Sequence, residues 1–127
     1  MSDYYSLNSV VLVGYMGSEI NHGKSKAGIA WATFLLATNE KFKTDEDPRA
    51  QYHKITAWGK RAERILEWGE KGKCMIVRGK LRHEKFPTAY GTVEIRTYVQ
   101  LDEFTFLGRK TDADGDIIYE QKPEDPI

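Results

Sequence analysis

Residues 51–69 read QYHKITAWGKRAERILEWG, and within them a β-strand pattern passes directly into a helical one. Residues 51–58 alternate with period two, which is typical of a strand. One face of this strand carries Tyr52, Lys54, Thr56 and Trp58, and the other carries His53, Ile55 and Ala57. Residues 60–68 place Ala62, Ile65 and Leu66 at helical spacing, and Gly69 follows where a left-handed cap is expected. A strand followed by one short helix is therefore predicted.

Two strands are predicted before this stretch and two after it. Residues 8–16 are rich in valine and end at glycines, while residues 29–38 place Ala30, Ala32, Phe34 and Leu36 on one face. Residues 75–85 and 92–101 alternate again, the latter with an extension near 104–107, and residues 86–91 between them are expected to form a hairpin loop. Five strands with a helix between the third and fourth are the order of the OB-fold. We therefore expect an all-β, five-stranded Greek-key barrel of this class.

Length and composition favour one cytoplasmic domain. The chain has 127 residues, of which 40% are hydrophobic and 30% charged, as in ordinary globular proteins. Cys74 is the only cysteine, so no intrachain disulfide can form. Residues 1–5 carry no positive side chain, and the apolar run Val10–Val13 is too short for a signal peptide or a membrane span.

Charge divides the chain into two parts. Lysine plus arginine equals aspartate plus glutamate at 19 each, but residues 110–127 hold six acids and two bases, a net charge of −4. Residues 1–109 therefore keep 17 bases and 13 acids, a net charge of +4. A basic body with an acidic tail is expected, with residues 1–108 as the barrel and residues 109–127 as a disordered tail.

Aromatic and basic residues lie close together at several points along the chain, a pattern typical of proteins that bind single-stranded nucleic acid. Binding an unpaired strand without reading its sequence requires flat rings for the bases and cations for the phosphates. The predicted stacking residues are Phe42, Tyr52, Trp58 and Phe86, and the predicted phosphate contacts are Lys43, Lys54, Lys60, Arg82 and Lys85. Tyr52 and Trp58 are six residues apart and so point to one face of their strand, together with Lys54.

Several other roles compete with this interpretation. Any single aromatic residue could instead fill the barrel, since aromatic side chains are mostly buried. An enzyme is not expected: His22, His53 and His83 lack metal-ligand spacing, and Cys74 is expected to be a small buried hydrophobe. No metal or cofactor is predicted. The remaining alternatives are an OB-fold replisome or primosome adaptor that binds DNA weakly, and an OB-fold protein that binds RNA.

Short motifs in a fixed order extend over residues 8–108. They are Asn8-Ser9-Val10-Val11-Leu12-Val13-Gly14 with Gly17, Leu36-Ala37-Thr38, Tyr52-His53, Trp58-Gly59-Lys60 with Ala62-Glu63, Lys71-Gly72, and Gly79-Lys80-Leu81-Arg82. In these motifs the sequence resembles the bacterial single-stranded DNA-binding protein family. Four aromatic residues stack on DNA in that family, and by position they correspond to Phe42, Tyr52, Trp58 and Phe86.

The resemblance carries further expectations. It implies a cytoplasmic, nucleoid-associated protein that protects single-stranded DNA in replication, recombination and repair. It also implies a homotetramer, with Asn8, Val10 and His53 at the interface between subunits. Family members end in an acidic tip that finishes with proline and phenylalanine and recruits partner proteins. This sequence ends Pro-Glu-Asp-Pro-Ile over residues 123–127, a departure that puts recruitment of replication and repair proteins through the tail in question.

Overall fold

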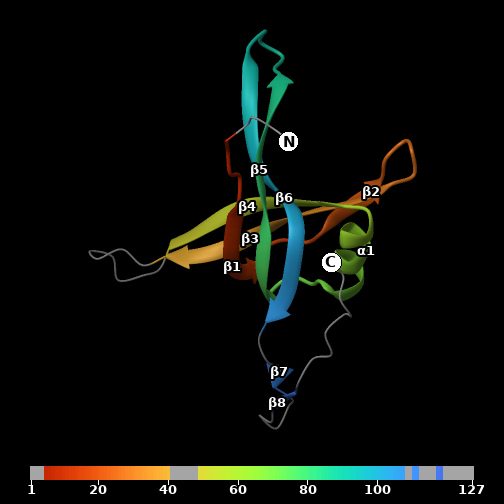
Figure 1. Cartoon of the computed structure of the whole chain (residues 1–127), viewed down its shortest axis with the longest axis vertical. Helices are drawn as coiled ribbons and strands as arrows, with labels where there is room; N and C mark the ends of the chain where they lie inside the picture. The colour runs from red at the N-terminus through yellow and green to blue at the C-terminus, as the bar shows by residue number, and fades with distance from the viewer. Residues whose placement is uncertain (1–4, 41–48, 108–109, 112–116, 119–127) are drawn as a thin grey trace.

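A computed structural model describes residues 5–40, 49–107, 110–111 and 117–118. Its elements in chain order are β1 (Val10–Met16), β2 (Asn21–Lys24), β3 (Ala30–Glu40), β4 (Arg49–Trp58), α1 (Lys60–Trp68), β5 (Cys74–Pro87), β6 (Val93–Leu107), β7 (Lys110–Thr111) and β8 (Ile117–Ile118). The strands cross one another to form a barrel, and α1 lies at one side of it (Figure 1). The end of the β5–β6 hairpin, residues 82–98, extends beyond the barrel as a long arm.

The strands form one sheet that closes on itself. Its order is β1-β5-β6-β4-β3-β2, and an additional pairing of Tyr15 with Ala37 joins β1 to β3. All pairs in this sheet are antiparallel except β4 with β6, where Ile55 pairs with Val99. α1 and β5 form the crossover that a parallel pair requires. β1, β3, β4, β5 and β6 are the five strands expected, so the OB-fold prediction is confirmed.

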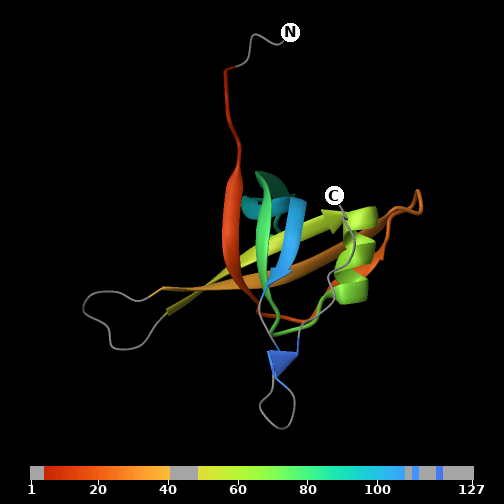
Figure 2. The same cartoon turned by 60° about the horizontal axis from the view of Figure 1, so that its bottom comes forward.

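The core lies inside the closed sheet and under the helix. The four residues predicted to share one face of β3, from Ala30 to Leu36, are all buried. Ala62 and Ile65 of α1 are fully buried as well, and Trp68 packs against the same cluster. Full burial of an isoleucine side chain stabilises a fold by about 1.5–3 kcal/mol. α1 therefore closes the barrel, and Figure 2 shows it beside the strand ends.

Three local features were missed or wrongly predicted. The first is β2, which was not predicted because it has no apolar alternation to reveal it. The strand reads Asn-His-Gly-Lys over residues 21–24 and is held by its pairing with β3. The second error concerns the predicted loop 86–91: β5 continues to Pro87, so Phe86 lies in a strand. The pairs Phe86–Glu94 and Pro87–Val93 extend the hairpin beyond residue 85, where the predicted strand ended.

The third error concerns the end of α1. Gly69 has φ −84° and ψ 148°, which is extended backbone and not the left-handed cap predicted. Glycine is required there for a steric reason, because a Cβ atom would lie 2.5 Å from the carbonyl oxygen of Ile65. The Gly69 N–H instead donates to that oxygen at 2.8 Å.

The predicted tail, residues 109–127, is described only in part. β7 and β8 lie within it and pair antiparallel, Lys110 with Ile118 and Thr111 with Ile117. The rest of the segment lies outside the described residues, so the boundary at residue 108 and the disorder of the tail stay predictions. Across the described ranges, no helix is both long enough and apolar enough to cross a membrane.

Candidate nucleic-acid interface

The outer face of β4 presents two aromatic rings to solvent. Tyr52 is 60% exposed and Trp58 is 45% exposed, and the exposed Lys54 lies between them on the same side of the strand. At about 3.3 Å per residue, the two rings stand about 20 Å apart along β4. Large apolar side chains at these positions contribute little to the core, so they are available to a ligand.

Thr56 departs from the solvated surface predicted for this face. Its exposed fraction is only 8%. β4 pairs with β3 on one side and with β6 on the other, and the register places Thr33 and Gln100 on either side of Thr56. A short side chain between two neighbours is covered by them. The open part of the face therefore comprises its two aromatic ends and Lys54.

Two glycines, Gly17 in the segment after β1 and Gly23 in β2, set the position of two rings on this surface. A Cβ atom on Gly17 would lie 3.0 Å from Cε1 of Tyr52, so the tyrosine ring rests closely against that glycine. Gly23 of β2 has the same relation to Trp31, at 2.8 Å from Cζ2. Trp31 is the β3 partner of Trp58 in the strand register, so the two tryptophans occupy one rung.

Phe86 lies on the arm, and one of its faces is covered. Cζ of Arg96 stands 4.2 Å from the centroid of the Phe86 ring, a cation–π contact. Nε of Arg96 is 3.5 Å from Oε1 of Glu94, an ion pair that is about half exposed on both sides. Sequence reasoning missed Arg96 because its contact depends on the register of the hairpin, in which Phe86 pairs with Glu94 and Glu84 pairs with Arg96.

The same face of the arm carries a row of hydrogen-bonded polar side chains. Nε of Arg82 donates to Oε1 of Gln100 at 2.9 Å, and the Tyr98 hydroxyl donates to Oε1 of Glu84 at 2.8 Å. Burial raises the pKa of Tyr98 above its ordinary value, and the hydrogen bond to Glu84 raises it further. Tyr98 therefore keeps its proton at neutral pH and holds the Glu84 carboxylate in place.

The structure divides the predicted cations into separate groups. Arg82 shares a face of the arm with Phe86, whereas Lys85 is adjacent to Phe86 in β5 and so points to the opposite face. Lys60 is exposed at the first residue of α1, close in sequence to Trp58. Phe42 and Lys43 lie outside the described residues.

The three residues predicted at a subunit interface make contacts within the chain. The side-chain amide of Asn8 donates to the carbonyl oxygen of Leu81 at 2.9 Å, and its oxygen accepts from the Leu81 N–H at 2.8 Å. Nε2 of His53 is 2.9 Å from the Thr38 hydroxyl. Val10 is half-buried and begins β1. The Asn8 side chain thus continues the contact between β1 and β5 two residues beyond the Val10–Gly79 pair.

Comparison with known proteins gives this geometry a context. The sequence profile of the Single-strand binding protein family matches residues 7–107. "Single-stranded DNA-binding protein 1" of Chlorobaculum tepidum is 29% identical over 113 residues, covering 86% of this chain and 70% of that protein. The "Single-stranded DNA-binding protein" of Streptococcus mutans serotype c is 30% identical over 110 residues, covering 86% of this chain and 67% of that protein.

A solved structure described as "Plasmodium falciparum SSB complex with ssDNA" superposes with a TM-score of 0.76. It is 26% identical in sequence, and the match covers 84% of this chain and all of the other. The profile match spans the whole barrel and the arm, and the fold agrees with it. This chain belongs to the single-strand binding protein family.

Proposed function

We propose that this protein binds single-stranded DNA without reading its sequence. The observation that carries the proposal is the pair of exposed rings, Tyr52 and Trp58, on one face of β4 with the exposed Lys54 between them. Unpaired bases stack on such rings whatever their identity, and cations beside them meet the phosphates. The relatives are named single-stranded DNA-binding proteins, and the P. falciparum protein was solved with single-stranded DNA, which supports the same function.

On the arm, we propose that Arg96 and Phe86 act together. The guanidinium covers one face of the ring, so a base that approaches from that side stacks on Arg96 and places its phosphate near a positive charge. Arg82 lies on the same face and is held by Gln100. It is placed where the bound DNA would continue from the arm toward the barrel.

The proposed activity is binding alone, with no catalysed reaction. Covering unpaired DNA protects it during replication, recombination and repair in the bacterial cytoplasm, where the nucleoid supplies such strands. Recruitment of replication or repair proteins by residues 109–127 stays a prediction.

The salt dependence of DNA binding tests the proposal. In a titration with oligo-dT, the logarithm of the affinity should fall linearly with the logarithm of salt concentration, by about 0.7 for each phosphate contacted. Lys54→Gln should reduce that slope by about 0.7, because one counterion fewer is released. Lys71→Gln, which removes an exposed lysine in the turn after α1, is the matched control and should leave the slope unchanged.

Competition in the same assay separates the proposal from its rivals. Equal-length duplex DNA should compete poorly, because its bases are not available for stacking. Stronger competition by oligo-U than by oligo-dT would favour an RNA-binding protein. Weak binding of every oligonucleotide, with a flat response to salt, would contradict the proposal and favour an adaptor that contacts proteins.

We also propose that copies of the chain associate through β1 into the homotetramer expected of the family. Val11 is 56% exposed and Val13 is 52% exposed on the outer face of this strand, and Tyr15 continues the row. In the described part of the chain, no strand pairs with the outer edge of β1 from Val10 to Val13. An exposed apolar strand with an unpaired edge is a surface that another copy can cover.

Val13→Glu tests this association. A charge in the centre of the row should convert the native assembly to smaller species, because burying an unpaired carboxylate is costly. The mass in solution, measured by light scattering, is the readout, and circular dichroism checks that the barrel remains folded. An unchanged mass would contradict the proposed interface. Glu19→Gln, on the connector between β1 and β2, is the control and should keep the native mass.

A further inference from the structure

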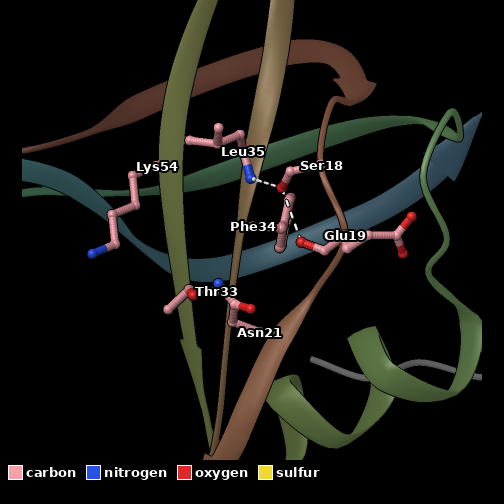
Figure 3. A pocket seen from close by; sticks show the side chains of 7 residues that line it. All are labelled: Ser18, Glu19, Asn21, Thr33, Phe34, Leu35 and Lys54. Atoms are coloured by element: carbon pink, nitrogen blue, oxygen red, sulfur yellow. Dashed lines mark hydrogen bonds between the residues drawn. The ribbon is translucent and has the colours of Figure 1, made fainter.

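A hollow of about 320 Å³ opens between β3 and the segment that connects β1 to β2. Its walls include Ser18 and Asn21 on one side, Thr33 and Leu35 of β3 on the other, and Lys54 of β4 at the rim (Figure 3). This volume lies at the lower end of the range of sites for small organic ligands, about 300–1,000 Å³.

The hollow exists because the segment between β1 and β2 diverges from β3 and then pairs with it again. The Gly17 N–H donates to the carbonyl oxygen of Leu35 at 2.7 Å, and pairing resumes where Asn21 meets Thr33. Between these points the three residues 18–20 lie opposite Phe34 alone, so the connector must bulge away from β3. The Ser18 hydroxyl fixes the bulge, since it accepts from the Leu35 N–H at 2.8 Å and donates to the Glu19 carbonyl oxygen at 2.9 Å.

The position of the hollow follows from the β3–β4 register. Successive outward rungs pair Ala37 with Tyr52, Leu35 with Lys54, Thr33 with Thr56 and Trp31 with Trp58. The hollow borders the two middle rungs and therefore lies between the two exposed rings. Tyr52 and Trp58 are about 20 Å apart along β4, so a DNA strand stacked on both rings passes beside the hollow.

The chemistry of the walls suits the edge of a nucleobase. In the described part of the chain, the amide of Asn21 and the hydroxyl of Thr33 make no hydrogen bond. Each can donate and accept, as base edges do. Leu35 is 37% exposed and supplies an apolar wall for a ring. The ammonium of Lys54 extends outward at the rim, and the Glu19 carboxylate points away from the β3 side chains (Figure 3).

We propose that this hollow is a subsite for one unpaired nucleobase, whose edge bonds to Asn21 and Thr33 while the neighbouring bases stack on Tyr52 and Trp58. The inference rests on the proposed function and deepens it. Stacking alone would leave the DNA between the two rings without contact to the protein. A base turned into the hollow would anchor it there, with the adjacent phosphate within reach of Lys54.

Two probes of equal length test the subsite: oligo-dT, and an oligomer of abasic tetrahydrofuran nucleotides with the same phosphates. Asn21→Ala and Thr33→Val should each weaken oligo-dT binding by about three- to tenfold, the range expected for one lost hydrogen bond. Neither change should weaken binding of the abasic oligomer at low salt, because it has no base. Gln51→Ala removes an exposed amide on the opposite face of β4 and is the matched control, with oligo-dT affinity unchanged.

The other outcomes are equally decisive. If both oligomers lose affinity equally, Asn21 and Thr33 contact the sugar–phosphate backbone and the base subsite is wrong. If neither oligomer loses affinity, nothing enters the hollow. Trp58→Ala in parallel keeps the two claims separate: loss of oligo-dT binding in this variant, with no effect of Asn21→Ala, overturns the subsite alone. Wild-type affinity in both variants would place the DNA away from this face of β4, whereas weak binding of oligo-dT by the unaltered protein would contradict the proposed function itself.

Discussion

Simultaneous replacement of Tyr52 and Trp58 by alanine is expected to weaken oligo-dT binding by roughly 30-fold or more. Each ring stacked on a base contributes about 1–3 kcal/mol, and 1.4 kcal/mol corresponds to a factor of ten in affinity. The two rings stand about 20 Å apart along β4, so their contributions should be nearly additive. Both side chains are exposed, and the barrel should therefore remain folded without them.

The matched control for this variant keeps the rings. Replacement of both Tyr52 and Trp58 by phenylalanine preserves two flat faces and should retain most of the affinity. Equilibrium binding by fluorescence anisotropy of a labelled oligo-dT provides the measurement, and thermal unfolding of each variant checks the fold. Wild-type affinity in the double-alanine variant would show that β4 is not the binding face. Equal loss in the phenylalanine variant would show that stacking is not the cause.

Gly79→Ala is expected to destabilise the fold strongly. Gly79 is buried in β5 at the irregularity between Arg78 and Gly79, where the strand passes from the barrel into the arm. A Cβ atom at this position would lie 2.1 Å from the carbonyl oxygen of Gln100 in β6. That oxygen belongs to the backbone, so relief requires the two strands to separate. Overpacking of this kind costs about 1–3 kcal/mol, and occasionally more.

Chemical denaturation measures the effect of Gly79→Ala directly. The midpoint should fall by an amount equivalent to about 3 kcal/mol, a large part of the 5–15 kcal/mol that stabilises a typical domain. Lys80→Ala, at the next and exposed residue, is the control and should change stability by less than about 0.5 kcal/mol. An unchanged midpoint for Gly79→Ala would mean that β5 and β6 approach less closely than described.

The barrel was predictable because its strongest signals are local. The alternation in residues 29–38 and 51–58 and the helical spacing of Ala62 and Ile65 each correspond to a buried face in the structure. β2 escaped prediction because pairing with β3, and not its own sequence, makes it a strand. Phe86 was misplaced in a loop because Pro87 and Gly91 are typical turn residues, whereas the β5–β6 pairing continues through Phe86–Glu94 to Pro87–Val93.

The site was predictable only where one strand provides it. Tyr52, Lys54 and Trp58 share a face of β4, and period two is enough to show this. Contacts between residues of different strands can be predicted only when the register of the strands is known, and sequence spacing does not provide it. Arg96 over Phe86, the covering of Thr56 by its neighbours, and the hollow beside Asn21 all depend on which residues oppose one another.

Fluorescence of a protein with a single tryptophan shows directly whether Trp58 stacks on bases. Trp31→Phe combined with Trp68→Phe leaves Trp58 as the only tryptophan, and both replaced side chains are half-buried beside the core or β2. If Trp58 stacks on bases, oligo-dT should quench its emission to a plateau, whereas duplex DNA should leave it nearly unchanged. Emission that stays constant through a titration in which oligo-dT binds would place the DNA elsewhere and contradict the account.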